Sequence, residues 1–481
     1  MSDTRASHPL PWSSFSTARL RAFQAFLDGS VRTRSDIATV IGQSLPSAAN
    51  HIDALESLGL ISEVSTRDGE AHRADAGSTE GSDPSQPASG RPLHSRPASP
   101  TRAEAERDAA AGGRPPRSTG AGRPAAAWRL NPRAGAAIGM ELRPGGPRRA
   151  AARVATRIVL LDGSIACERE RAVGWKELRA TRSLIREEAR AIQQTPDAAG
   201  LSVTSLGIAL PGVVDCYRSL LIYAPNLFLS NVGFADLESS LGMPVFVENE
   251  ANAAALAEYV LRSSSSGRRW SLGATERPGA VAGTGGAESA QGDARSGAVA
   301  ARPGESMVRI SITEGVGAGI LVDGGLMRGD TWRAGEFGHM AIREGSRPCN
   351  CGRTGCWEQY ASEWALLADA RGAGVGARTI GGVVRQVAVG RPEAQAVWRS
   401  YVHALATGIE NIAACIDPRT IVLGGEIASA GDLLVTPLRR EVESISFLTS
   451  GIQVDVSLMG RWPASVGAAL LSFGNIFHNS P

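Results

Sequence analysis

The segment Gly338-His-Met-Ala-Ile-Arg-Glu-Gly-Ser-Arg-Pro-Cys-Asn-Cys-Gly-Arg-Thr-Gly-Cys-Trp-Glu358 contains one histidine and three cysteines, with the cysteines inside eight residues. Three thiolates and one imidazole fill the four positions of a tetrahedral zinc ion, and a site without an open position is structural rather than catalytic. Glycines at 352 and 355 let the chain turn tightly around an ion. The segment therefore predicts a structural Zn2+ site; the alternative is three reduced thiols in a loop. The predicted ligands are His339, Cys349, Cys351 and Cys356.

The composition is that of an ordinary globular chain of more than one domain. The 481 residues carry a net charge of +2, so any nucleic-acid binding must come from a local basic patch. No apolar run is long enough to span a bilayer, and residues 1–14 lack the pattern of a secretory signal. We therefore expect a cytoplasmic protein without a membrane partner, in which clustered cysteines favour metal over disulfides.

Changes in composition along the chain predict its domains. We expect a winged helix-turn-helix over 14–66, a return strand and hinge over 122–137, and an α/β domain over 138–481. Two stretches rich in Gly, Ser, Pro, Ala and Arg, 67–121 and 263–304, are expected to be disordered because they cannot bury enough apolar surface. Alternating strand-like and helical runs in the large domain indicate sheets flanked by helices; the helical runs include Leu178–Gln193, Ala251–Leu261 and Ala394–Ile416.

The amino-terminal unit has the element order of a winged helix-turn-helix. A helix from Arg34 ends at Gly42, and Ser44 is the expected N-cap of a second helix that reaches Leu58. The second helix would enter the major groove, while Arg123 lies where a wing tip returns toward the minor groove. A helical cap or dimerisation bundle is the alternative. The expected DNA-contacting residues are Arg34, Ser47, Asn50, His51 and Arg123.

Five further segments resemble the ROK family of repressors and sugar kinases. They are Ile208-Ala-Leu-Pro-Gly-Val-Val-Asp215 with Ala224-Pro-Asn226, Val247-Glu-Asn-Glu-Ala-Asn252, Gly315-Val-Gly-Ala-Gly319 with Gly335-Glu-Phe-Gly-His339, the cysteine cluster ending in Glu358, and Ile421-Val-Leu-Gly-Gly425 with Gly467-Ala-Ala-Leu470. The resemblance implies an actin-like, ribonuclease-H-like fold of two lobes with a sugar between them. Gly122-Arg-Pro124 after a helix-turn-helix resembles the repressor branch, and Glu-Asn-Glu-Ala-Asn resembles its xylose repressors.

The resemblance also implies a set of sugar-binding residues. Carboxylates and amides pair with several sugar hydroxyls at once, and His339 would bind the metal through one ring nitrogen and offer the other to a hydroxyl. Alternatively, Glu336 and Glu358 only support the metal loop. The implied sugar-binding residues are Asn249, Glu250, Glu336, His339 and Glu358.

Three departures from the family's kinases argue against phosphoryl transfer. The catalytic aspartate is replaced by Glu250, whose carboxylate stands one methylene further out. The stretch 138–145 lacks the Asp-x-Gly-Gly-Thr phosphate hairpin, and Glu314 interrupts the second phosphate loop with a negative charge. We expect a sugar-responsive repressor that is not an enzyme, with operator DNA, a small sugar effector and its own copies (homodimer or tetramer) as partners. The alternatives are an active sugar kinase with an appended DNA-binding domain, and a zinc-containing scaffold for protein partners.

Overall fold

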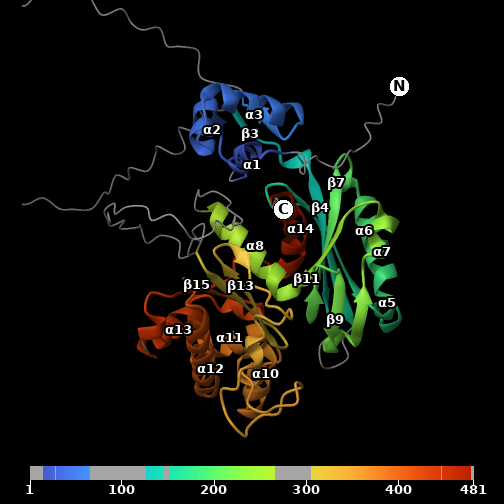
Figure 1. The fold of residues 1–481 in the computed structure, drawn as a ribbon. Coiled ribbons are helices and arrows are strands. Elements are labelled where there is room, and N and C mark those ends of the chain that lie inside the picture. The colour runs from blue at the N-terminus through green and yellow to red at the C-terminus, as the bar shows by residue number, and fades with distance from the viewer. Residues whose placement is uncertain are drawn as a thin grey trace, which may run out of the picture.

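The computed structural model describes residues 15–27, 29–64, 126–144, 151–265, 305–445 and 447–477. These residues form a small amino-terminal unit and two larger lobes (Figure 1). Arg123 and the two stretches expected to be disordered, 67–121 and 263–304, fall outside the described residues apart from the backbone of 263–265, which ends a helix. The described helices include none with the length and apolar character needed to cross a bilayer.

The amino-terminal unit has three helices and a three-stranded sheet. Its elements are α1 (Thr17–Gln24), β1 (Arg32–Thr33), α2 (Arg34–Ile41), α3 (Leu45–Ser57), β2 (Ile61–Glu63) and β3 (Ala127–Leu130). The sheet has the order β1-β3-β2, so the strand after the long insertion returns to pair with both earlier strands. Phe23, Ile37, Ile52 and Leu55 are buried between the helices. This order of helices and strands agrees with the winged helix-turn-helix expected from the sequence.

Local sequence explains the turn between α2 and α3. Thr33 and Asp36 form a capping box at the start of α2, each side chain bonding the other's backbone N–H. Gly42 ends α2 in the left-handed conformation, with φ of 65°. Ser44 occupies the N-cap of α3, as expected, but its side chain makes no capping hydrogen bond. Ser44 therefore stands at the predicted N-cap position, but its hydroxyl does not accept a hydrogen bond from a backbone N–H of the first turn.

The amino lobe is built on a five-stranded sheet of order β11-β7-β4-β5-β6. Its strands are β4 (Ala136–Arg143), β5 (Ala152–Leu160), β6 (Ile165–Val173), β7 (Val203–Leu210) and β11 (Val245–Asn249). Helices α5 (Trp175–Arg179), α6 (Thr181–Gln193) and α7 (Asp236–Leu241) belong to this lobe, with 3₁₀ turns η3 (Pro132–Ala134), η4 (Pro196–Ala198) and η5 (Pro225–Leu227). A small sheet follows β7, made of β8 (Val213–Asp215), β9 (Leu220–Ala224) and β10 (Leu229–Gly233).

The carboxyl lobe repeats the plan with the sheet order β14-β13-β12-β15-β16. Its strands are β12 (Met307–Ile312), β13 (Val316–Val322), β14 (Gly325–Leu326), β15 (Thr420–Gly424) and β16 (Gln453–Val456). Val308, Ile310 and Ile312 alternate along β12 and face the outer helices. Its helices are α9 (Glu358–Ala361), α10 (Glu363–Gly372), α11 (Ile380–Ala388), α12 (Pro392–Ile416) and α13 (Asp432–Ile445), with 3₁₀ turns η6 (Phe337–His339), η7 (Glu426–Ala430) and η8 (Phe447–Thr449).

Two helices, α8 (Glu250–Ser265) and α14 (Pro463–Phe477), lie between the two sheets (Figure 1). Helix α14 packs on β4 and β7 of the amino lobe, α8 packs on β12 and β13 of the carboxyl lobe, and the helices pack on each other. A Cβ atom at Gly207 would lie 1.8 Å from the carbonyl oxygen of Ala468, and one at Gly467 would lie 1.7 Å from that of Ala253. Backbone therefore touches backbone at these contacts, and any side chain would separate the layers.

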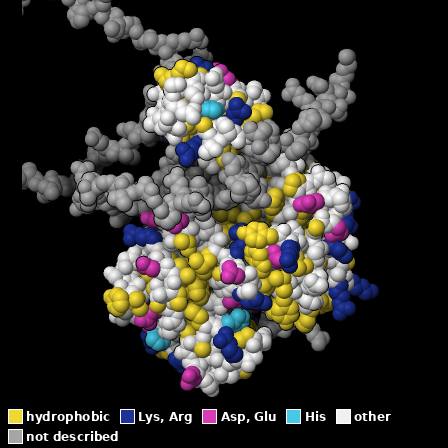
Figure 2. All heavy atoms as spheres, viewed as in Figure 1, with side chains coloured by type: hydrophobic (Ala, Val, Ile, Leu, Met, Phe, Trp, Pro, Cys, Tyr) yellow, Lys and Arg dark blue, Asp and Glu magenta, His cyan; other side chains and the backbone are white. Residues whose placement is uncertain are grey.

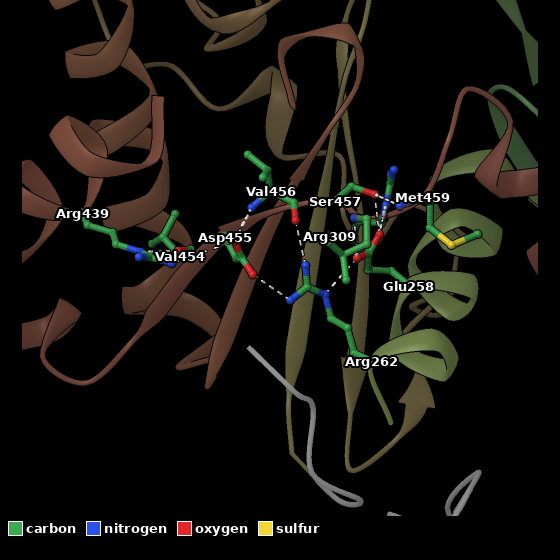
Figure 3. Close-up of polar contacts among 10 residues, drawn as sticks. Glu258, Arg262, Arg309, Arg439, Val454, Asp455, Val456, Ser457 and Met459 are labelled. Atoms are coloured by element: carbon green, nitrogen blue, oxygen red, sulfur yellow. Dashed lines mark hydrogen bonds and ion pairs between the residues drawn. The ribbon is translucent and has the colours of Figure 1, made fainter. Parts of the chain in front are cut away.

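A buried group of charges ties α8 to the carboxyl-lobe sheet (Figure 3). Arg262 is fully buried, and its guanidinium lies 2.8 Å from Glu258 Oε1 and 3.0 Å from Asp455 Oδ2. Arg309, on the face of β12 opposite Val308, lies 3.6 Å from Glu258 Oε2. Buried charges are tolerated only when they are paired, so these contacts fix the position of α8 along the sheet.

The helical run expected over Leu178–Gln193 is two helices. Ala180 breaks it, with φ of −93° and ψ of 40°, so that α5 ends at Arg179 and α6 begins at Thr181. The Thr181 hydroxyl bonds back to the carbonyl of Leu178 at this break. Hydroxyl side chains compete with helical backbone bonds in this way, which a period of apolar residues does not reveal.

Gly467→Ala should destabilise the protein, although alanine is ordinarily the better helix former. The added methyl group would meet the Ala253 carbonyl, and overpacking of this kind costs about 1–3 kcal/mol in unfolding free energy. Denaturant unfolding measures the change. Gly460→Ala is the control, because a Cβ there has nothing within 4 Å. Equal stability of the two variants would contradict the close approach of α14 to α8.

Candidate sugar and metal site

The four predicted metal ligands meet in one place. The ligand atoms of His339, Cys349, Cys351 and Cys356 all lie within 4.8 Å of one another. The loop that carries them is folded back on itself by two β-bridges, Ala341 with Cys356 and Pro348 with Thr354. Gly355 has φ of 77°, and a Cβ there would lie 1.6 Å from the Arg343 carbonyl oxygen, so this turn requires glycine.

The donor set and its spacing fit a tetrahedral metal ion. The Sγ atoms of Cys351 and Cys356 are 3.5 Å apart, and Cys349 Sγ is 3.6 Å from His339 Nδ1. A tetrahedron with metal–sulfur bonds of about 2.3 Å has edges of about 3.8 Å, close to these separations. Hydrogen bonding, from the Arg353 backbone above all, lowers the pKa of the Cys351 thiol, while burial raises the pKa of Cys349 and of Cys356, so in the absence of a metal one thiol of the three is the favoured thiolate. The cluster can therefore hold a metal ion.

Two carboxylates flank the ring of His339. Glu358 Oε1 lies 3.7 Å from Nδ1, the nitrogen on the cysteine side, and Glu336 Oε2 lies 3.9 Å from Nε2. The Cys349 thiol also donates to Glu358 Oε1, at 2.9 Å, and a bound metal would displace this proton. One ring nitrogen thus faces the metal position and the other faces Glu336. This is the division of roles that sugar binding beside a structural metal would need.

Asn249 and Glu250 stand where β11 ends and α8 begins. Asn249 Oδ1 accepts from the backbone N–H groups of Ala251 and Asn252, at 2.8 and 3.2 Å. Its Nδ2 donates to the Gly212 carbonyl at 2.8 Å, which leaves one amide hydrogen for a ligand. Asn249 therefore caps α8 as well as standing in the predicted site, a structural task that the sequence pattern did not indicate.

The Glu250 carboxyl group is shielded from water and lies near other carboxylates. Burial, with the nearby carboxylates of Glu141 and Glu336 adding to it, raises the pKa of Glu250 to about 8. Its Oε2 atom is buried and has no hydrogen-bond partner. A carboxyl group with its pKa raised in this way can donate a hydrogen bond to a ligand when it is protonated.

Two buried carboxylates near the site, Glu141 and Glu363, were missed by the sequence analysis. Glu141 is buried on β4, accepts from the Ser465 N–H at 3.0 Å and pairs with Arg143 at 2.5 Å. Glu363 accepts from the Ile427 N–H at 2.9 Å, and burial raises its pKa to about 7. A charged residue inside the apolar run Ala136–Leu142 was a usable signal for Glu141. For Glu363, at an ordinary helix start, no sequence signal was available.

The residues expected to contact DNA are placed unequally on α2 and α3. Arg34 and Asn50 are exposed, and the Arg34 guanidinium lies 5.2 Å from the ring centre of Trp128. Ser47 is half-buried, and its hydroxyl bonds to the Gln43 side chain. His51 is half-buried with Nδ1 unpaired, and burial and the charge of Arg19 lower its pKa. The exposed part of the predicted surface is therefore centred on Arg34 and Asn50.

Glu250→Gln should stabilise the ligand-free protein increasingly as pH rises from 5 to 9. The folded-state pKa of about 8 lies above the ordinary value of 4.5, so the contribution of Glu250 to stability is fully present below pH 4.5 and is lost as pH rises through 8. Glutamine cannot ionise and escapes this loss. Melting temperatures across the pH range measure the difference, with exposed Glu344→Gln as the control. A difference that does not change with pH would contradict the buried setting of Glu250.

Comparison with known proteins agrees with this geometry. The sequence profile of the ROK family matches residues 159–272 and 287–472. The chain is 27% identical over 299 residues to a glucokinase of Streptomyces coelicolor, covering 57% of this chain and 81% of that one. It is 29% identical over 245 residues to the xylose repressor of Bacillus subtilis, covering 50% of this chain and 52% of that one.

Two solved structures share the fold. A ROK family transcriptional regulator, homologous to the E. coli MLC protein, aligns with a TM-score of 0.64 at 19% identity and covers 96% of this chain and 97% of its own. A ROK family glucokinase from Streptomyces griseus, in complex with glucose and AMPPNP, aligns with a TM-score of 0.53 at 24% identity and covers 70% of this chain and 98% of its own. The regulator matches nearly the whole chain and the kinase most of it. The profile match, the two lobes and the metal-ligand cluster together identify the chain as a member of the ROK family.

Proposed function

We propose that this protein is a sugar-responsive, DNA-binding transcriptional repressor whose lobes bind a sugar without phosphorylating it. Helix α8 is the observation that carries the proposal. The helix begins at Glu250, directly after Asn249 at the end of β11. Its later residues Leu256, Tyr259 and Val260 belong to one hydrophobic cluster with residues of the amino-terminal unit. A conformational change at the sugar site could therefore be transmitted along α8 toward the amino-terminal unit (Figure 1).

The same cluster includes α14. Leu470 and Phe473 of α14 are buried with Trp128 and Leu130 of β3, the strand that links the amino-terminal unit to the amino lobe. An effector shifts such an arrangement only by its different affinity for two states, and couplings of about 1–3 kcal/mol are typical. The names of the relatives support this function, since Bacillus subtilis contributes a xylose repressor and the structure similar over nearly the whole chain is a transcriptional regulator.

Carboxylates at the site argue against the kinase alternative, which the glucokinase relatives keep in view. Glu250 stands where the family's kinases place an aspartate, and its carboxylate lies one methylene further from the backbone, a displacement to which proton transfer is sensitive. Glu314 is exposed in the stretch that corresponds to the second phosphate loop, with its pKa raised by desolvation, and Glu363 accepts a hydrogen bond from the Ile427 N–H. A triphosphate would meet carboxylates where the chemistry requires cations or N–H groups.

Zinc is the metal that we propose for the His339 cluster. Three thiolates and an imidazole select a soft, tetrahedral ion and occupy all four positions, so the ion would hold the loop between His339 and Glu358 in shape without activating water. The sugar-facing nitrogen of His339 and the carboxylates of Glu336 and Glu358 depend on that loop for their placement.

Purified protein should contain about one zinc ion per chain, and Cys351→Ser should lower the metal content, the melting temperature and the affinity for sugar together. Elemental analysis and thermal unfolding measure these effects. Cys415→Ser is the control, because Cys415 is exposed and lies outside the cluster. Full stability of metal-free wild-type protein would rule out a structural ion.

DNA binding should depend on sugar through Glu336. On a fragment of the protein's own upstream region, the effector sugar should change wild-type affinity by about 5–150-fold. Glu336→Ala should lose this response while keeping wild-type affinity in the absence of sugar, because Glu336 lies at the His339 site and not on α2 or α3. Asn50→Ala should weaken DNA binding and leave sugar binding unchanged. Fluorescence anisotropy for DNA and calorimetry for sugar measure the two properties separately.

Glu344→Ala is the matched control for Glu336→Ala, since Glu344 is an exposed glutamate eight positions further along the same region. A normal sugar response in Glu336→Ala would place the effector elsewhere. A coupled assay with ATP and the sugars that bind distinguishes the repressor from the kinase alternative: turnover on the order of 1 per second or more would make the protein a kinase.

We further propose that the protein forms a homodimer or tetramer. One winged helix-turn-helix reads only a short half-site, and two copies related by symmetry match a palindromic operator.

A further inference from the structure

A segment of the carboxyl lobe, Met327–Gly335, reaches across to the amino lobe beside the candidate sugar site. It follows β14 and leads directly into Glu336. Two backbone hydrogen bonds fold it into a compact loop, Ala334 N–H to Arg328 O at 3.1 Å and Trp332 N–H to Gly329 O at 3.3 Å. Arg328 Nε then lies 2.7 Å from Glu248 Oε2, and Glu248 is 1% exposed on β11 of the other lobe. The loop belongs to the carboxyl lobe, and this ion pair fixes it to the amino lobe as well.

A second contact between the lobes is aromatic. The ring centres of Trp332 and Tyr217 are 5.0 Å apart with an angle of 71° between planes, an edge-to-face pair. Tyr217 lies in the turn between β8 and β9 and is 86% exposed. The Asp215 carboxylate holds this turn by accepting from the backbone N–H groups of Tyr217 and Arg218, at 3.1 Å each. An exposed aromatic ring on a well-ordered turn therefore meets a ring from the opposite lobe.

Trp332 has an unfavourable backbone conformation. Its φ is 62°, in the left-handed region that glycine tolerates and bulky side chains avoid. Such a residue persists only where its surroundings impose it, and strained positions concentrate at ligand sites. The ring contact with Tyr217 and the anchor at Arg328 are the surroundings that hold it here.

The ion pair adjoins Asn249, a residue assigned to sugar, and the aromatic pair includes a residue of the loop that leads into Glu336, another such residue. The Glu248 carboxylate that binds Arg328 also accepts from the Asn249 backbone at 2.9 Å and from the Asn252 side chain at 3.0 Å. Glu336 lies four positions after Trp332. The loop therefore spans from the Asn249 side of the site to the Glu336 side. Sugars present apolar C–H faces as well as hydroxyls, and an aromatic ring is the side chain that packs on such a face.

We propose that Trp332 and Tyr217 form an aromatic clasp that closes over the bound effector and packs on the apolar face of a neutral sugar ring. The proposal rests on the proposed sugar-binding function and adds the residues that set affinity for the ring. Polar residues of the site would select hydroxyls, while the clasp would favour a sugar with an unobstructed C–H face. Because its two rings come from different lobes, the clasp is complete only when the lobes are closed.

The chain provides a matched control for this pair. Trp175 and Phe228 form a similar edge-to-face contact, with ring centres 5.3 Å apart and an angle of 65°, and both are exposed. Both belong to the amino lobe, so this pair does not join the lobes. Figure 2 shows hydrophobic side chains at the surface of both lobes, so surface aromatic character alone does not distinguish a ligand contact.

The test compares Trp332→Gly, Tyr217→Ala and Trp175→Ala in the full-length protein. Glycine suits the backbone at 332, so Trp332→Gly should fold with wild-type stability. Calorimetric titration with D-xylose, D-glucose and N-acetyl-D-glucosamine should show about tenfold weaker binding for the first two variants and wild-type binding for Trp175→Ala. Trp332→Phe, which keeps a ring, should retain most of the affinity. Wild-type affinity in Trp332→Gly would overturn the proposal.

Hydrogen exchange tests the clasp without a ligand. Amide exchange in 213–220 and 327–335 should be faster in Tyr217→Ala and Trp332→Gly than in wild type, and unchanged in Trp175→Ala. If wild-type protein bound none of the three sugars, the proposed sugar-binding function would fail on that panel, and exchange would still judge the contact between lobes. Unchanged exchange in both clasp variants would overturn the clasp whatever the effector.

Discussion

The approach of two helix backbones to each other and to two sheets is the constraint on which the rest of the structure depends. Among the described elements, only helices α8 and α14 lie between the two lobe sheets. Glycine and alanine residues allow these helices to approach each other and the sheets closely. Gly139, Gly207 and Gly319 open the sheet surfaces to the helices, and Gly467 lets the helices touch. Interiors packed this closely move as layers and not by gradual deformation. Relative motion of the lobes must therefore occur along this pair.

Charge placement follows from the same arrangement. The Glu258–Arg262–Asp455 group fixes α8 to the carboxyl lobe, so that α8 moves with that lobe's sheet. Glu141 accepts from the first turn of α14, which fixes α14 to the amino lobe. One central helix is thus fixed to each lobe. The start of α8 carries Glu250, and its far half belongs to a hydrophobic cluster that also contains residues of the amino-terminal unit.

Much of the fold and part of the site follow from sequence because their signals are local. The cysteine spacing identified the four residues that meet at one point, and apolar runs located strands such as β12 and β15. Glu336 and His339 are close in sequence and remain close in space. Asn249 was expected only to face a ligand, yet most of its amide is used to cap α8, because capping depends on where a helix begins. The break at Ala180 accompanies a local hydrogen bond of the Thr181 hydroxyl, and the Glu363 contact with Ile427 depends on tertiary packing; the period of apolar residues encodes neither. Expectations for Arg123 concern a residue outside the described part of the chain.

The pairing of β2 with β3 has a consequence for how the chain tolerates change. The Val64 N–H donates to the Ala127 carbonyl at 2.8 Å, so the two ends of the intervening 62-residue stretch lie side by side. Closing a loop between neighbouring ends costs about 0.6 kcal/mol for each doubling of its length. The stability of the amino-terminal unit should therefore depend little on the length of the segment inserted there. A short linker or an entire folded reporter domain could replace 67–121 while Gly122-Arg-Pro124 is kept for the predicted wing, which makes this hairpin a permissive insertion point for engineering.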